Sequence, residues 1–190
     1  MPIETLPDLI ADGLDVLFVG INPSIYSAER GHYFARPGNR FWPCFSRSSL
    51  SSAARAGLSA ATLGPEHDRL LLAYGIGFTD AVKRPTAKAS DLAPRELAAG
   101  VAHLVEKIER YRPRIAVFHG VTGYRNVHES LAGKAAPIAL GLQPVRIATT
   151  RIFLVPNPSG ANAHFTRDDQ VRWYDAVAMT DNALARDRCR

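Results

Sequence analysis

The sequence predicts an α/β fold, a three-layer α/β/α sandwich around a central, mostly parallel sheet of four or five strands. Short, continuous apolar runs are typical of parallel strands that are buried on both faces. Segments with the periodicity of amphipathic helices lie between these runs, and this alternation indicates helices on both faces of the sheet. The length of 190 residues and the hydrophobic content of 46% suit one domain, which we expect to span residues 1–190.

Three apolar runs rich in β-branched residues are the predicted strands. They are residues 15–21 (DVLFVGI), 115–118 (IAVF) and 152–155 (IFLV), and each run ends at residues that favour turns. The first and the third stop at prolines, which cannot donate a hydrogen bond to a neighbouring strand. Residues 143–147 are predicted to pair as an edge strand with the run that follows them.

The predicted helices lie between and beyond these strands. One begins near residues 91–96 and ends before Pro113, because it carries an apolar stripe at helical spacing, formed by Leu97, Val101, Leu104, Val105 and Ile108. A final helix begins at about Arg167 and turns Tyr174 inward. We also expect a short helix over Leu6 to Ala11. Phe41 and Trp42 are interpreted as the buried start of a further helix.

Composition narrows the classes of function. A net charge of +5 and a pI of about 9.5 suit a polyanionic partner, although many basic proteins never bind nucleic acid. There is no run of 18 apolar residues and no secretory signal pattern, so we expect a soluble chain in the cytoplasm. The two cysteines form no CxxC and the histidines form no HExxH, so we expect neither a metal nor a cofactor.

Two loops that follow buried strands are the first indication of a site. Residues 20–24 (GINPS) follow the first strand, and residues 157–160 (NPSG) follow the last. Ligands of open α/β sheets bind at the carboxyl ends of the strands, where both loops leave the sheet. The alternative is a pair of plain turns, because Asn, Pro, Ser and Gly are all turn residues.

Two further segments add aromatic and acidic candidates. Residues 31–42 are dense in aromatic, basic and turn residues, and Phe34, isolated among loop residues, is the best candidate to stack on an extruded base. Residues 74–80 contain glycines that would let the backbone approach a ligand closely. Asp80 at the end of this segment is either a helix N-cap or a pocket carboxylate.

As an ordered set, these motifs resemble the mismatch-specific uracil and thymine-DNA glycosylase family, within the uracil-DNA glycosylase superfamily. The resemblance runs from about Asp15 to Phe165. It depends on GINP (20–23), HYFARPGNRFW (32–42), YGIGFT (74–79), RPRIAVFHG (112–120), GLQP (141–144) and NPSG (157–160). The family implies a single α/β domain without a cofactor that excises uracil opposite guanine and, in some members, thymine or damaged pyrimidines.

The resemblance also implies roles for individual residues. Asn22 would position the attacking water, Phe34 would stack on the flipped base, and residues 157–160 would open a loop that enters the double helix. The residues expected around the base are Gly20, Ile21, Pro23, Ser24, Phe34, Asn39 and Asp80. The residues expected to contact DNA are Arg36, Lys83, Arg84, Asn157, Pro158, Ser159, Gly160, Ala161, Asn162 and His164.

Three positions depart from the family pattern. Ser24 stands where members often have glycine, Ala163 stands where they usually have arginine, and Asp80 stands where animal members have asparagine. The GINP loop also lacks the carboxylate that faster uracil-DNA glycosylases place beside their water. We therefore expect a slow enzyme that gains selectivity from mispaired bases, which unstack more easily.

The expected partner is double-stranded DNA with a G·U or similar mismatch, bound by a monomer. Three other interpretations remain open from the sequence. They are a related glycosylase for another damaged base such as hypoxanthine, a DNA-lesion binding protein with little turnover, and an α/β nucleotide-binding protein. The last lacks support, because neither a P-loop nor a Gly-x-Gly-x-x-Gly follows the first strand.

Overall fold

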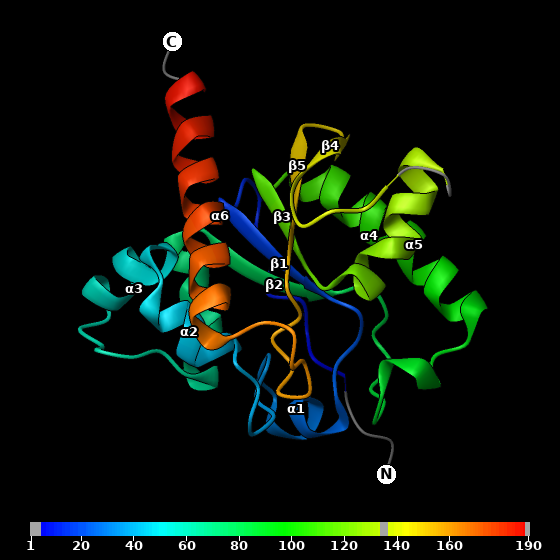
Figure 1. Cartoon of the computed structure of the whole chain (residues 1–190), viewed down its shortest axis with the longest axis horizontal. Helices are drawn as coiled ribbons and strands as arrows, with labels where there is room; N and C mark the ends of the chain where they lie inside the picture. Colours follow the sequence, from blue (N-terminus) through cyan, green and yellow to red (C-terminus); the bar gives the residue numbers. More distant parts are fainter. Residues whose placement is uncertain (1–4, 134–136, 189–190) are drawn as a thin grey trace.

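A computed structural model describes residues 5–133 and 137–188 and contains a five-stranded sheet (Figure 1). The strands are β1 (Val16–Gly20), β2 (Ile76–Asp80), β3 (Ile115–His119), β4 (Gly141–Ile147) and β5 (Thr150–Val155). Their order across the sheet is β2-β1-β3-β5-β4. All neighbours pair in parallel except β4, which pairs antiparallel with β5 at the edge. The predicted fold class is confirmed, and the predicted edge strand over residues 143–147 is part of β4.

Helices cover both faces of this sheet. They are α1 (Ile25–Arg30), α2 (Phe41–Arg47), α3 (Ser52–Gly57), α4 (Pro94–Tyr111), α5 (Val121–Ala132) and α6 (Arg167–Arg188). Short 3₁₀ helices span Ser49–Ser51, Pro65–Tyr74 and Ala89–Asp91. The bounds of α4 and the start of α6 agree with the sequence-based prediction. In Figure 1, α2 and α6 lie to one side of the sheet and α4 and α5 to the other.

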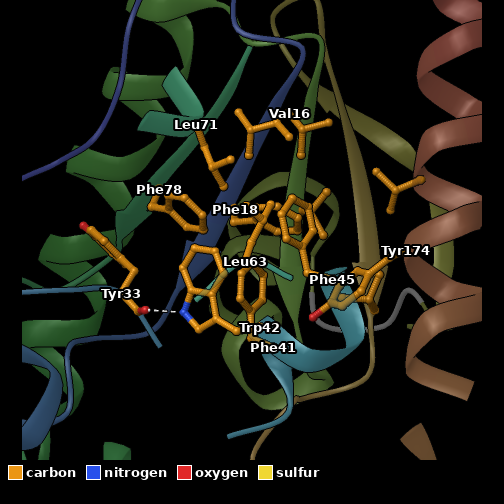
Figure 2. Close-up of a cluster of buried hydrophobic side chains, with 14 of the residues drawn as sticks. Val16, Phe18, Tyr33, Phe41, Trp42, Phe45, Leu63, Leu71, Phe78 and Tyr174 are labelled. Atoms are coloured by element: carbon orange, nitrogen blue, oxygen red, sulfur yellow. Dashed lines mark hydrogen bonds between the residues drawn. The ribbon is translucent and has the colours of Figure 1, made fainter. Parts of the chain in front are cut away.

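The face that carries α2 and α6 packs through an aromatic core (Figure 2). Phe18 of β1 lies at its centre, with its ring 5.0 Å from Phe41 and 5.6 Å from Phe78, measured between centroids. Phe41 and Trp42 are buried at the start of α2, as predicted, and the Trp42 indole donates a hydrogen bond to the Tyr33 carbonyl over 2.9 Å. This contact fixes the loop before α2 against that helix.

The opposite face is aliphatic and packs against α4 and α5. Leu17, Val19 and Ala116 of the sheet contact the buried stripe of α4 and the inner side of α5. Because successive side chains of a strand point to opposite faces, β1 contributes Phe18 to one core and its neighbours to the other. The strands are therefore buried on both sides, and their carboxyl ends emerge between the two helical layers.

The N-terminal segment corrects one prediction. Leu6 to Ala11 is not a helix; it runs extended, and Leu9 exchanges two backbone hydrogen bonds with Phe78 of β2, over 2.9 and 2.8 Å. Gly77 permits this approach, because a Cβ atom there would lie 2.4 Å from the Leu9 carbonyl oxygen. Pairing with a strand about seventy residues away is a tertiary contact that local helix propensity does not reveal.

None of the helices within the described ranges is both long enough and apolar enough to cross a bilayer.

Candidate active site

The carboxyl ends of the strands and the loops beyond them surround a cavity of about 210 Å³. In Figure 1 this end of the sheet is at the bottom, where α1 and the loop after β5 meet. The lining residues are Leu6, Gly20, Ile21, Asn22, Pro23, Ser24, Ser27, Tyr33, Phe34, Arg36, Asn39, Asp80, Thr86, Ala87, Ala89, His119, Asn157, Pro158 and Ser159. All the residues expected around the base are among them.

The side-chain amide of Asn22 is held in one orientation. Its Nδ2 donates hydrogen bonds to Thr86 Oγ1 over 2.7 Å and to the Arg84 carbonyl over 2.9 Å. The Thr86 hydroxyl has one proton, which it donates to the Lys88 carbonyl over 2.7 Å, so toward Asn22 it acts as an acceptor. These two acceptors, together with the Pro23 carbonyl at 3.3 Å, fix the position of Nδ2 and leave Oδ1 to accept a hydrogen bond from a water.

The backbone around Asn22 is fixed in the same way. Thr86 donates its N–H to the Pro23 carbonyl over 3.1 Å and accepts from the Ile25 N–H over 3.2 Å, which forms a parallel bridge beside Ser24. Ser24 caps α1, with its Oγ accepting from the Ser27 N–H over 3.1 Å. Ser24 stands where family members often have glycine, and its hydroxyl stabilises the start of α1. Thr86 is a site residue that sequence reasoning missed.

Asp80 is a pocket carboxylate. It is the last residue of β2, only 4% exposed, and its Oδ2 has no hydrogen-bond partner among the described residues. Burial raises the pKa of the Asp80 carboxyl to about 7, against the opposing charge of Lys83. Gly20 pairs with Asp80 across the sheet, and a Cβ atom on Gly20 would lie 2.2 Å from Asp80 Oδ1. Only a glycine at that position leaves room for the carboxylate.

The alternative interpretation of Asp80 as a helix N-cap is wrong. The chain leaves β2 into a loop, and the next helical turn, Ala89–Asp91, begins after Lys88.

Phe34 presents a flat ring to the cavity. It stacks on Phe41 with 4.3 Å between centroids and 15° between ring planes. Its backbone lies in the left-handed region with φ 54°, which is uncommon for a residue other than glycine and frequent at functional sites. Because Phe41 is buried in the core, Phe34 is supported from behind and can stack on a planar ligand.

His119 is a second residue that sequence reasoning missed. It is the last residue of β3, it is buried, and its Nε2 lies 3.2 Å from the Tyr174 hydroxyl. Burial lowers the pKa of His119 to about 3, so the imidazole is neutral near pH 7. Its position directly after an apolar strand, before Gly120, is the signal in the sequence that places it at the carboxyl edge.

The loop after β5 is ordered by its own side chains. Asn157 Oδ1 accepts from the Ser159 N–H over 2.9 Å, and Asn162 Nδ2 donates to the Asn157 carbonyl over 3.0 Å. A neighbouring cavity of about 270 Å³ separates part of this loop from residues 36–39. The two segments also approach each other closely at Gly160, where a Cβ atom would lie 2.7 Å from the Gly38 carbonyl oxygen. Exposed at the tip are Ala161, Ala163 and His164.

The basic residues near the cavity differ in their surroundings. Arg36 is exposed at the rim of the cavity. Lys83 forms an ion pair with Asp8 over 2.9 Å, and Arg84 forms one with Glu96 over 2.7 Å. Arg40 donates to the Phe165 carbonyl over 2.6 Å and so ties α2 to the segment before α6. Of these cations, Arg36 is the one positioned to meet a ligand that approaches the cavity.

A metal centre is not evident at this site. Over residues 5–133 and 137–188, no group of three or more His, Cys, Asp or Glu side chains has an arrangement that would hold a metal ion. The residues that line the cavity include Asn22 with its amide, Asp80 with its carboxyl and His119 with its neutral imidazole, which suit the orientation of water and the transfer of a proton.

Comparison with known proteins agrees with this architecture. The chain resembles the solution NMR structure of a protein from Methanosarcina acetivorans that is provisionally described as a uracil DNA glycosylase, with a TM-score of 0.56 and 18% identity. The match covers 94% of this chain and 99% of that one, and at this identity it shows the fold alone. A family model described as the uracil DNA glycosylase superfamily matches residues 7–178, and on that match the chain belongs to the uracil DNA glycosylase superfamily.

Proposed function

We propose that the protein is a DNA glycosylase that hydrolyses the bond between a flipped uracil and its deoxyribose, with a preference for uracil opposite guanine. The observation that carries this proposal is the Asn22 amide, fixed by Thr86 beside the Phe34 ring in one small cavity. At about 210 Å³ the cavity is smaller than most sites for drug-sized ligands and suits a single base. Membership of the superfamily supports the class of reaction.

Asn22 acts by orientation. A side-chain amide is not a useful base near pH 7, but its Oδ1 can accept a hydrogen bond from a water and direct a lone pair of that water at the sugar C1′. The glycosidic bond breaks with its electron pair leaving on the base, the water oxygen bonds to C1′, and the water proton passes to solvent or to the departing base. Positioning accounts for the rate, and the absence of a carboxylate from the 20–24 loop agrees with a slow enzyme.

Asp80 acts on the leaving base. Its buried carboxyl is half protonated near pH 7, and the neutral form can donate a hydrogen bond to an oxygen of the departing pyrimidine. The ionised form would instead oppose the negative charge that develops on the base. The same carboxyl disfavours modified cytosines that carry an acid group, because two carboxylates would meet in one cavity.

The double helix is proposed to lie across the rim of the cavity. Phe34 stacks on the extruded base, Arg36 contacts phosphate, and the loop of residues 157–164 fills the space that the base leaves. Without an arginine at position 163, Asn162 and His164 are the side chains available to face the unpaired guanine. Selection of mismatches then follows from their weaker stacking.

A panel of duplexes tests the proposed substrate. The protein is incubated with G·U, A·U, G·T and G·hypoxanthine duplexes and with single-stranded U, and abasic sites are cleaved with alkali. We expect strand cleavage to be fastest with G·U. Faster release of hypoxanthine would assign a different damaged base to the same cavity. Tight binding without any base release would indicate a lesion-binding protein.

Substitution of the amide tests the mechanism. We expect Asn22→Ala to reduce the single-turnover rate of uracil release about 100-fold or more, while duplex affinity stays within about threefold. Asn126→Ala, on α5 and outside the cavity lining, is the matched control and should keep the wild-type rate. A rate for Asn22→Ala within tenfold of wild type would exclude the amide from the mechanism.

A further inference from the structure

A second, larger cavity lies at the opposite end of the sheet. It has a volume of about 740 Å³ and is lined by Asp12, Gly13, Arg110, Tyr111, Arg112, Pro113, Arg114, Arg146, Thr149 and Arg151. These residues precede β1 and β3 or flank the β4–β5 turn, which is at the top in Figure 1, away from the candidate active site. Five arginines line the cavity beside one carboxylate, Asp12.

The positive charge of one of these arginines, Arg114, is neutralised by carboxylates, and this residue has a structural role. Arg114 forms ion pairs with Asp15 and with Asp181, the latter over 3.0 Å, and its side chain is 16% exposed. Its carbonyl accepts the Arg151 N–H over 3.0 Å. Arg114 thereby joins the amino end of β3 to β5 and α6 and fixes the backbone position of Arg151.

Arg146 and Arg151 form an unfavourable pair in the absence of an anion. They are direct cross-strand partners in the β4–β5 ladder, so their side chains share a face of the sheet. Like charges placed opposite each other are destabilising. In addition, the Nε of Arg151 is buried without a hydrogen-bond partner among the described residues, and an unsatisfied buried donor is itself destabilising. An anion between the two guanidinium groups would remove both penalties.

The C-terminal end of α4 also lines the cavity. Arg110 places its guanidinium 5.3 Å from the centroid of the Tyr111 ring, and Arg112 ends the helix with φ 47°. The partial negative charge of a helix C-terminus accounts for part of the preference for cations here. Arg146 and Arg151 are on β4 and β5 and not on this helix. The positive charge around the cavity therefore exceeds what the neighbouring carboxylates and the helix end neutralise.

We infer that this arginine pocket is a second nucleic-acid site, which takes the phosphodiester backbone of a DNA segment other than the one in the candidate active site. Several cations spread around about 740 Å³ match a series of phosphates better than a single ion, and the half-buried Tyr111 offers an aromatic face beside them. A straight duplex across the other end of the sheet cannot also enter this pocket. One protein molecule thus holds two DNA segments.

The choice of DNA as the anion rests on the proposed function. The experiment that tests it measures DNA binding and does not require uracil release. A uracil-free duplex is fixed to a surface, the protein is bound to it, and capture of a second, fluorescent uracil-free duplex is measured. We expect the wild type to capture the second duplex. The double variant Arg146→Ala/Arg151→Ala should bind the first duplex normally and lose capture of the second at least tenfold. Its melting temperature should be unchanged or higher, because the repulsion is relieved.

A control variant removes the same charge elsewhere. Arg69→Ala/Arg125→Ala replaces two exposed arginines outside the pocket and should capture like the wild type. If both variants lose capture of the second duplex equally, the loss reflects net charge alone and the inference is overturned. Undiminished capture by the pocket variant would overturn it as well. Displacement of the captured duplex by a phosphoserine peptide at equal phosphate concentration would also overturn it. If the wild type captures the second duplex but releases no uracil from any duplex, the inference about the arginine pocket stands and the proposed function is refuted.

Discussion

A single carboxyl, Asp80, links the chemistry of the site to pH. Its pKa is raised to about 7 by burial, whereas that of an unfolded aspartate is near 4. Because the neutral form is the one proposed to donate to the leaving base, we expect the single-turnover rate of the wild type to fall as pH rises through 7. Asp80→Asn, which does not titrate, should give a flat profile, a higher rate at pH 8 and some release of carboxylcytosine. A wild-type rate that rises through pH 7 would instead make Asp80 the base for the water.

The same group makes a testable contribution to stability. Its folded pKa lies above its unfolded pKa, so its stabilising contribution is complete below about pH 4 and is lost as pH rises through 7. The difference in unfolding free energy between Asp80→Asn and wild type should therefore increase toward alkaline pH, by on the order of 4 kcal/mol. Urea unfolding of both proteins at pH 4 and pH 8 measures it. A difference that does not change with pH would show that the carboxyl is already solvated in the folded protein.

Thr86 is expected to act through Asn22. Thr86→Val keeps the shape of the side chain but removes the acceptor that fixes the amide, so the amide can rotate and present Nδ2 to the water. We expect about a tenfold loss of single-turnover rate with duplex affinity unchanged. Thr62→Val, on an exposed loop, is the control. A wild-type rate in Thr86→Val would mean that the Arg84 and Pro23 carbonyls are sufficient to orient the amide.

At this scale the sequence could predict the residues that carry chemistry but not those that support them. Asn22 and Phe34 stand out because they follow a buried strand or interrupt a loop, and the structure places both at the cavity. Thr86 lies in a segment that no local pattern marks, and its role depends on a hydrogen bond to a residue 64 positions away. His119 is visible only as the end of a strand, and its neutrality depends on the burial that the fold produces.

At the scale of elements, two loops act as a unit. The loop after β5 and residues 36–40 are joined by the Arg40 N–H, which donates to the Pro158 carbonyl over 2.8 Å, and they meet closely at Gly160. Gly160→Ala would place a methyl group 2.7 Å from the Gly38 carbonyl oxygen and should push the loops apart. We expect duplex affinity and excision to fall about tenfold with little change in melting temperature, because both loops are at the surface. Ala61→Ser, at an exposed position outside both cavities of the site, is the control and should leave affinity unchanged.

Elements were predictable from sequence where their signals were local. The stripe of α4 and the apolar runs of β1, β3 and β5 need no partner to be recognised. The strand β2 carries Gly77 and ends in a charged residue, so its pattern indicated only a glycine-rich apolar segment. The extended segment from Leu6 to Ala11 pairs with β2. Sequence analysis therefore predicted neither β2 nor this segment as a strand.

At the scale of the whole molecule, the distribution of charge bears on the proposed binding of DNA. Three of the cations near the candidate active site, Lys83, Arg84 and Arg40, already have partners within the protein. Arg36 and the Arg146–Arg151 pair of the arginine pocket are the cations proposed to meet phosphates. We expect duplex affinity to fall at least about tenfold between about 50 and 200 mM salt, because each neutralised phosphate releases counterions. Fluorescence anisotropy over this range measures the slope. An affinity that does not depend on salt would argue against a DNA partner.

The extended N-terminal segment also bears on how copies of the protein behave at high local concentration. By pairing with β2, Leu9 occupies backbone groups at one margin of the sheet that would otherwise be open to another chain. At the other margin, Pro144 lacks an N–H, and the pairing of β4 is irregular between Leu142 and Arg146. Neither margin is a good template for adding a strand, so copies at high local concentration should remain separate and resist sheet-to-sheet aggregation.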